Sequence, residues 1–179
     1  PLANYVTFIS EKSEKEALRL VRLKDGKHST VLNPVGGEFI SYPKTINTGC
    51  PVILHVGTKE NKNLESTAIA LKGFPCKIRI VGNLTEGQKL ALKLYGIDYE
   101  QVSNLTNEEI LQEYINCDYV NFPSLYEGFG MPIIEGQAIG RPVLTSNLSP
   151  MKEVAGNAAI LVDPTKPEDI RRGYEAMKQ

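Results

Sequence analysis

The sequence has 179 residues, of which 41% are hydrophobic and 23% charged, and this predicts one folded domain or slightly more and excludes a disordered chain. With 20 basic and 21 acidic side chains the net charge is −1, so no global field attracts nucleic acid or an anionic membrane. No nucleic-acid partner is therefore expected, and any bound anion must be held by a local arrangement of groups.

The cysteines and the apolar runs predict the cellular compartment of the protein. Cys50, Cys76 and Cys117 are too far apart in sequence to form a zinc-ligand pair, and their odd number argues against a disulfide scaffold. Reduced thiols in a cytoplasmic protein fit best, and no metal site is expected. There is no apolar run of about 18 residues and no signal-peptide pattern, so no transmembrane segment is expected.

The first part of the chain predicts short elements: a strand at 5–9, an amphipathic helix at 12–23 and a strand at 30–32. Turn-forming residues follow, and we expect a boundary or hinge within 33–50. Residues 1–45 are interpreted as the tail of an amino-terminal domain with its linker, and 46–179 as a second domain. Because Pro1 directly precedes a strand pattern and Gln179 stops a helical one, both ends are expected to be cuts from a longer chain.

From residue 52 onward, strand and helix patterns alternate. Strands are predicted at 52–57, 77–82, 99–102, 118–122, 141–145 and 159–162, and helices at 64–71, 86–95, 107–116, 132–139, 151–155 and from 167. Thr85 and Thr106 are placed as helix N-caps, Glu109 completes a capping box, and Arg141 is expected to cap the helix before it. Alternation without hairpin dipeptides predicts an α/β fold with a doubly wound, Rossmann-like parallel sheet, which binds ligands at the carboxyl ends of its strands.

The most informative segment runs from residue 123 to residue 135, where a predicted strand ends in a glycine-flanked turn and a helix follows. Gly128 and Gly130 let backbone amides approach a ligand closely. The start of the helix adds free N–H groups and the positive end of the helix dipole. Together these features predict an anion site.

Two carboxylates flank this turn, Glu127 within it and Glu135 about one turn into the helix. An ionised carboxylate only accepts hydrogen bonds and can take them from two neighbouring hydroxyls, so a vicinal diol is its natural ligand. One glutamate could bind a sugar ring and the other a ribose, with a diphosphate between them. The spacing alone also fits a simpler explanation, in which a glutamate near a helix start is only a partner of the helix dipole.

The full string PSLYEGFGMPIIEG at 123–136 resembles the E-x7-E signature of family 4 retaining glycosyltransferases. The similarity covers roughly residues 50–170, including His55 to Gly57, Lys62 to Leu64 and Val162 to Pro164. It implies that the chain is the carboxy-terminal, nucleotide-sugar-binding half of a two-domain GT-B fold. It also implies a metal-independent enzyme without a cofactor, whose donor substrate is a nucleoside-diphosphate sugar.

The resemblance also implies roles for individual residues. In this family the first glutamate of the signature contacts the donor sugar and the second contacts the ribose, which assigns these roles to Glu127 and Glu135. Lys62 would be the cation that binds the diphosphate, and it forms with Glu127 the predicted catalytic pair. The backbone amides of Phe129 and Gly130 would meet the sugar or the diphosphate.

The loop that leaves the first strand of the predicted domain, starting at Gly57, departs from the family pattern. Family members usually carry an arginine where this sequence has Thr58 or Asn61. Lys59 is the candidate for the missing charge, and the alternative is that Lys59 is an ordinary solvated surface lysine. The loop that would bind the base begins at Val102.

Other nucleotide-binding and hydrolytic motifs are absent from the sequence: a Gly-x-Gly-x-x-Gly at a strand–helix junction, a P-loop, a Gly-x-Ser-x-Gly elbow and an Asp-x-Asp pair. We therefore expect a retaining hexosyltransferase of polysaccharide or glycoconjugate biosynthesis, incomplete as this fragment. A glycan or lipid-linked acceptor would bind through the absent domain. The full enzyme is expected in the cytoplasm or at the cytoplasmic face of the membrane. A sugar-nucleotide epimerase and a non-catalytic sugar-nucleotide-binding module remain alternatives.

Overall fold

The computed structural model describes residues 3–178, so Pro1, Leu2 and Gln179 lie outside the described residues, including both ends on which the expectation of a longer chain was based. A six-stranded sheet with the order β5-β4-β3-β6-β7-β8 forms the main body, and every pairing is parallel. The strands are β3 (Val52–Val56), β4 (Lys77–Val81), β5 (Tyr99–Val102), β6 (Tyr119–Phe122), β7 (Val143–Ser146) and β8 (Ile160–Val162). Because the strand order reverses between β3 and β6, the predicted doubly wound α/β fold is confirmed.

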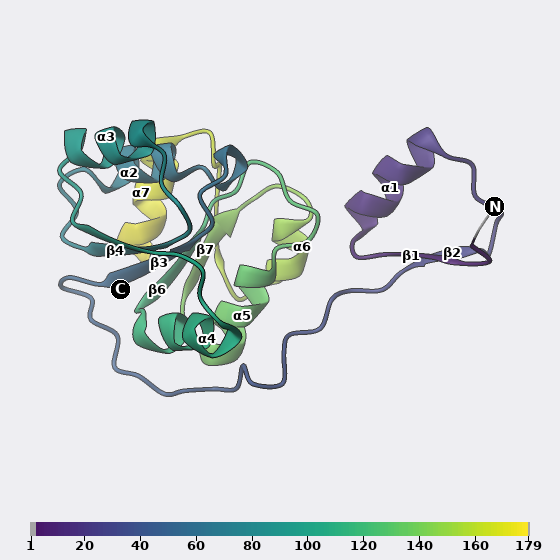
Figure 1. Ribbon diagram of the computed structural model, residues 1–179, viewed down its shortest axis with the longest axis horizontal. Coiled ribbons are helices and arrows are strands. Elements are labelled where there is room, and N and C mark those ends of the chain that lie inside the picture. Colours follow the sequence, from purple (N-terminus) through teal and green to yellow (C-terminus); the bar gives the residue numbers. More distant parts are fainter. Residues whose placement is uncertain (1–2, 179) are drawn as a thin grey trace.

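Helices cover both faces of this sheet (Figure 1). One layer holds α2 (Leu64–Leu71), α3 (Glu86–Leu94) and α7 (Pro167–Ala176), and the other holds α4 (Asn107–Asn116), α5 (Met131–Ile139) and α6 (Met151–Ala155). Neighbouring residues of β3 show why two cores form: Ile53 packs into one buried cluster and Leu54 into the other, since successive side chains of a strand point to opposite faces. Within residues 3–178 no helix has the length and apolar character needed to cross a membrane.

Local sequence signals fix several helix ends. Thr85 pairs with Gln88 and Thr106 pairs with Glu109 in complete capping boxes, which confirms both predicted N-caps. α5 ends at Gly140, whose φ of 82° lies in the left-handed region that glycine adopts without strain. Sequence patterns did not predict the short 3-10 helix η1 (Glu60–Lys62) after β3.

The amino-terminal segment forms its own small unit. β1 (Val6–Phe8) and β2 (His28–Thr30) pair in parallel, and α1 (Glu11–Leu20) connects them. β2 begins two residues before the predicted strand, and α1 is shorter than expected because the backbone becomes extended at Val21. In Figure 1 this segment lies beside the main body, joined by a long extended linker that passes beneath it. The predicted domain division near residue 45 stays a prediction.

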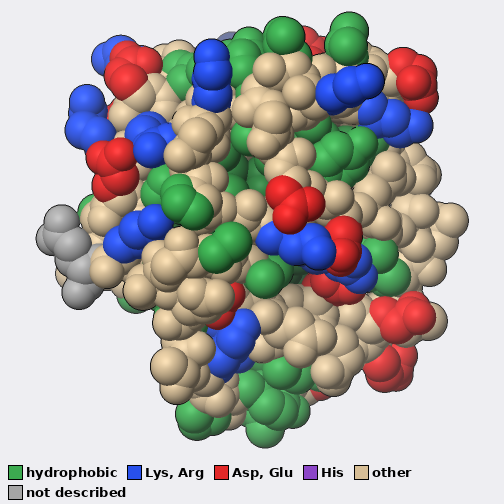
Figure 2. Space-filling model, turned by 90° about the vertical axis from the view of Figure 1, so that its left-hand side faces the viewer, with side chains coloured by type: hydrophobic (Ala, Val, Ile, Leu, Met, Phe, Trp, Pro, Cys, Tyr) green, Lys and Arg blue, Asp and Glu red, His purple; other side chains and the backbone are tan. Residues whose placement is uncertain are grey.

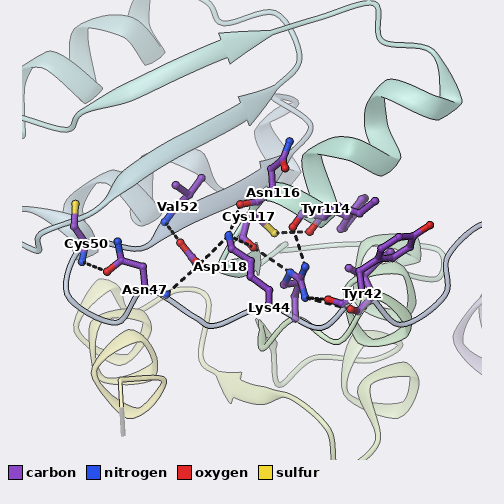
Figure 3. A network of polar contacts seen from close by, with 12 residues as sticks. Tyr42, Lys44, Asn47, Cys50, Val52, Tyr114, Asn116, Cys117 and Asp118 are labelled. Carbon is purple, nitrogen blue, oxygen red and sulfur yellow. Dashed lines mark hydrogen bonds and ion pairs between the residues drawn. The ribbon is translucent and has the colours of Figure 1, made fainter.

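The linker is bound firmly to the amino ends of the strands (Figure 3). Asp118, directly before β6, accepts hydrogen bonds from the backbone amides of Val52 at 2.8 Å and Asn47 at 3.2 Å, and Lys44 Nζ lies 2.9 Å from its Oδ1 atom. Burial opposes ionisation of Asp118, but these hydrogen bonds outweigh it and lower the pKa of the carboxyl. The linker downstream of Tyr42 therefore belongs structurally to the main body.

Arg141 strengthens the same end of the sheet. Its guanidinium is buried and donates to four backbone carbonyls, those of Cys117 at 3.1 Å, Tyr42 at 2.8 Å, Ile139 at 3.2 Å and Ile115 at 2.8 Å. The bond to Ile139, the last residue of α5, is the expected helix cap. The bonds to the linker and to α4 were not predicted, because they join segments that are distant in sequence.

Acidic and basic side chains are mixed on the surface. Figure 2 shows them next to one another across one face of the main body, without a large area of a single sign. Acidic and basic side chains also form ion pairs, such as Lys77 with Glu100 and Arg79 with Glu113. The pattern agrees with the small net charge of the sequence.

Candidate functional site

Loops from three strands meet at the carboxyl edge of the sheet and line one open groove of about 600 Å³. The lining residues follow β3, β4 and β6: Gly57, Thr58, Lys59, Asn61, Lys62, Gly82, Tyr126, Glu127 and Gly128. This is the edge at which a doubly wound sheet is expected to bind ligands. Five predicted site residues are brought together here, namely Gly57, Lys59, Lys62, Glu127 and Gly128.

Lys62 and Glu127 form an ion pair inside this groove. Lys62 Nζ lies 2.6 Å from Glu127 Oε1, and the side chains are 19% and 14% exposed. The same ammonium group lies 4.6 Å from the centre of the Phe122 ring, which adds a cation–π contact. The predicted cation and the predicted sugar-binding carboxylate therefore neutralise each other at the wall of the groove.

The backbone around Lys62 is shaped to place this side chain. Asn63 adopts a left-handed conformation with φ of 62°, and its Nδ2 donates to the carbonyls of Pro123 at 3.1 Å and Pro164 at 2.7 Å. Gly57 has φ of 93°, and a Cβ atom there would lie only 3.0 Å from Lys62 Cε. A side chain at residue 57 would therefore push Lys62 away from Glu127.

The two positions where the family usually has arginine now have a visible role. Asn61 Nδ2 donates to the carbonyl of Tyr126 at 2.9 Å and to Glu127 Oε1 at 3.2 Å, and Asn61 O accepts from Leu125 N at 2.8 Å. Thr58 Oγ1 donates to Asn83 O at 2.8 Å. Both residues hold neighbouring loops together, and sequence reasoning treated them only as missing charges.

Lys59 lines the groove as an exposed side chain. Its contact with a diphosphate stays a prediction. Within residues 3–178 no group of three or more His, Cys, Asp or Glu side chains lies together as candidate metal ligands.

Four predicted site residues do not line this groove, namely Val102, Phe129, Gly130 and Glu135. Glu135 projects from α5 toward α4, where the buried Tyr114 donates a 2.6 Å hydrogen bond to its Oε2 atom. Burial raises the pKa of Glu135, the hydrogen bond from Tyr114 opposes this, and the Glu38 carboxylate adds to it. Val102 ends β5, and its carbonyl accepts from Gly82 N at 2.7 Å. The predicted contacts of Glu135 with a ribose and of Val102 with a base stay predictions.

The turn between β6 and α5 offers its backbone rather than its side chains. Phe129 is 5% exposed, because its ring packs inside the protein, and Gly130 caps α5 with φ of 119°. Within the described part of the chain, the amides of Gly128, Phe129 and Gly130 donate to no backbone acceptor. The turn therefore has the free N–H groups that an anion site requires.

His55 lies on β3 beneath this edge and is 1% exposed. Asn121 Nδ2 donates to its Nδ1 atom at 2.8 Å and also contacts Thr67, while Asn121 Oδ1 accepts from Tyr174. Among residues 3–178 the Nε2 atom of His55 has no partner. Burial, with a contribution from the Lys62 charge, lowers the pKa of His55 to about 4, so the ring is neutral near pH 7. His55 is therefore a buried core residue of β3 with one nitrogen that has no partner in the described chain.

Comparison with known families agrees with this geometry. The family model described as "Glycosyl transferases group 1" matches residues 38–178. The chain belongs to the group 1 glycosyl transferases. The matched range includes the groove, the signature turn and the linker residues that anchor to the sheet.

Curated relatives of this group 1 glycosyl transferase chain include the serotype-specific mannosyltransferase WbdA of Escherichia coli, which is 35% identical over 96 residues. Those residues are 50% of this chain and 12% of the relative. The O-antigen chain mannosyltransferase B of Escherichia coli is 45% identical over 49 residues, 27% of this chain and 13% of the relative. The chain thus matches about an eighth of the length of these relatives.

Solved structures share the fold. The glycosyltransferase WaaG, involved in lipopolysaccharide biosynthesis, superposes with a TM-score of 0.81 at 13% identity, covering 97% of this chain and 53% of that one. The Anabaena protein HepE in complex with UDP-glucose gives a TM-score of 0.79 at 16% identity, covering 97% of this chain and 54% of that one. These matches are consistent with one half of a GT-B fold.

Proposed function

We propose that this chain binds the nucleoside-diphosphate-sugar donor of a glycosyltransferase in the groove that Lys62 and Glu127 line. The observation that carries the proposal is the 2.6 Å ion pair at the carboxyl edge of the sheet, beside a turn in which the amides of Gly128, Phe129 and Gly130 have no backbone acceptor among residues 3–178. A donor has a diphosphate that needs cationic and N–H partners and a sugar whose hydroxyls need an acceptor. The groove has one group for each requirement.

Binding of the donor exchanges the partners of this ion pair. The diphosphate takes Lys62, and the sugar hydroxyls take the Glu127 carboxylate that Lys62 leaves. When the bond between the anomeric carbon and the diphosphate breaks, negative charge grows on the leaving oxygen, and a cation already in place stabilises that charge. Lys62 and Glu127 are thus the residues that we propose to act in catalysis, and Lys59 is the candidate for a second cation.

The whole reaction needs an acceptor, which we place in a further domain. The resemblance to family 4 favours transfer of the sugar with retention, and the names of the relatives favour a mannosyl donor and a polysaccharide or lipid-linked acceptor. Cys50, Cys76 and Cys117 are free thiols, which favours a reducing compartment such as the cytoplasm, including the cytoplasmic face of a membrane. Glu135, with one carboxylate oxygen held by Tyr114, is the proposed partner of the ribose.

Calorimetric titration of this chain with UDP, GDP, ADP, UDP-glucose and GDP-mannose tests the proposal. One nucleoside diphosphate is expected to bind, and Lys62→Met is expected to weaken it by about 10- to 100-fold, the effect of losing a charge-assisted hydrogen bond. Glu127→Gln is expected to weaken only the sugar-bearing form. Lys77→Met is the matched control, because Lys77 also forms an ion pair with a glutamate but lies away from the groove.

Failure of all the nucleotides to bind would reject the donor site. Binding that persists while the chain, rejoined to an acceptor domain, transfers no sugar would identify a non-catalytic binding module instead. If transfer occurs, the anomeric configuration of the product, read by NMR, decides whether the configuration is retained.

A further inference from the structure

The helix α1 contacts the turn that carries Glu127, although about 110 residues separate them in sequence. Ser10, at the start of α1, is 2% exposed, and its hydroxyl donates a 2.7 Å hydrogen bond to the carbonyl of Gly128. The hydroxyl of Ser13 lies 3.3 Å from the same carbonyl oxygen. Ile9 packs against the same glycine, since a Cβ atom on Gly128 would lie 3.5 Å from Ile9 Cδ1.

A second set of contacts holds the other side of Glu127. Tyr126 donates from its hydroxyl to Glu16 at 2.8 Å, and Lys12 Nζ lies 3.7 Å from the centre of the Tyr126 ring. These groups are more exposed than Ser10, so each contact contributes less to the stability of the turn. α1 therefore holds the turn at the residue before Glu127 and at the residue after it, most strongly at Gly128.

Fixing the Gly128 carbonyl also fixes the next amide. A peptide unit is planar and trans, so its C=O and N–H point in opposite directions. Because the Gly128 oxygen points toward Ser10, the N–H of Phe129 points away from α1. Among residues 3–178 that N–H has no backbone acceptor, and Gly128 itself lines the groove.

We propose that Ser10 is a positioning residue of the donor site, which holds the Gly128–Phe129 peptide so that the Phe129 amide faces the β-phosphate of the donor. This inference rests on the proposed function. It makes the amino-terminal segment part of the donor site, although the groups that we propose to touch the donor come from the main body. Seating of α1 on the turn then controls how well the diphosphate is bound.

Substitutions at Ser10 separate this role from the helix cap that Ser10 also forms with Ser13 N. Glycine is nearly as good an N-cap as serine but has no hydroxyl, whereas threonine keeps both the cap and the donor. We expect Ser10→Gly to weaken binding of the nucleoside diphosphate by about three- to tenfold, the factor expected for one hydrogen bond. The affinity for the nucleoside monophosphate should stay within about twofold of the wild-type value, so the ratio of the two affinities changes. Ser10→Thr should restore the wild-type ratio. Lys15→Ala, on the solvent side of α1, should not change it.

NMR relaxation of the backbone amides gives a readout that needs no nucleotide. The order parameter of the Phe129 amide is expected near the rigid value of about 0.85 in the wild type and Ser10→Thr, and lower in Ser10→Gly. The signals of α1 show in the same spectra whether the helix stays folded. If the wild type binds the diphosphate and Ser10→Gly leaves the ratio of the two affinities unchanged, the proposal is wrong. An equal loss of affinity for the diphosphate and the monophosphate would also overturn it, because that result indicates only a structural role. Failure of the wild type to bind would instead reject the proposed function itself.

Discussion

Charged side chains have different kinds of partner at the two ends of the same sheet. At the amino ends of the strands, Arg141 is buried against four carbonyls and Asp118 accepts from two backbone amides and Lys44. At the carboxyl ends, Lys62 and Glu127 are paired with each other at the wall of an open groove, beside amides with no backbone partner in the described chain. The first end holds the linker in place, and the second leaves its groups able to change partners.

The two ends differ in the cost of removing a charged group, because the partners that remain are different. A buried charge with fixed backbone partners cannot be removed without leaving those partners unsatisfied, which is costly in a water-free site. An ion pair that lines a groove can exchange its partner for a ligand or for water, which costs less than leaving a fully buried charge unpaired. Stability should therefore depend on the amino ends and binding on the carboxyl ends.

The largest effect on stability is expected for Arg141→Ala. This change leaves the carbonyls of Cys117, Tyr42, Ile139 and Ile115 without their donor, and we expect the free energy of unfolding to fall by about 3–5 kcal/mol. Urea denaturation followed by circular dichroism measures it. Arg141→Lys, which keeps a charge and some donors, should lose less. A loss below about 1 kcal/mol for Arg141→Ala would remove the basis of the comparison between the two ends.

His55 lies between these ends and predicts how stability responds to acid. Its pKa is about 4 in the folded chain against 6.5 for an unperturbed histidine, so the unfolded chain binds the proton first. The contribution of His55 to the free energy of unfolding is therefore fully present above pH 6.5. It falls by about 3 kcal/mol as the pH drops to 4. In His55→Leu this part of the pH dependence should disappear. Equal losses in the wild type and the variant between pH 6.5 and 4 would show that another group is responsible.

The sequence was sufficient for most of the fold because its signals are local. Alternating strand and helix patterns predicted the parallel sheet, and the residues around Thr85, Thr106 and Gly140 predicted helix ends that the structure confirms. The loops that follow the strands also identified the edge where the groove lies. Each of these inferences needs only neighbouring residues and the rule that parallel strands end at the same edge.

The contacts that complete the site could not be predicted in this way. Asn61 meets Glu127 across 66 positions, Tyr114 meets Glu135 across 21, and Ser10 meets Gly128 across 118. None of these three residues belongs to a local motif that indicates its partner, since the pairings depend on how distant elements pack. The resemblance to a family identified the groups that would touch the donor, but not those that hold them in position.

The smallest effect on stability is expected at the groove, and it gives the sharpest contrast with Arg141. Lys62→Met removes a charge whose side chain is 19% exposed and whose main partner, Glu127, keeps a hydrogen bond from Asn61. Methionine retains an apolar stem that can still contact the Phe122 ring, so we expect a change in the free energy of unfolding of about 1–2 kcal/mol, less than for Arg141→Ala. The same urea experiment measures it beside Arg141→Ala. If Lys62→Met instead cost as much as Arg141→Ala, the ion pair would be a structural element of the fold, and its free exchange with a diphosphate would no longer follow from its position.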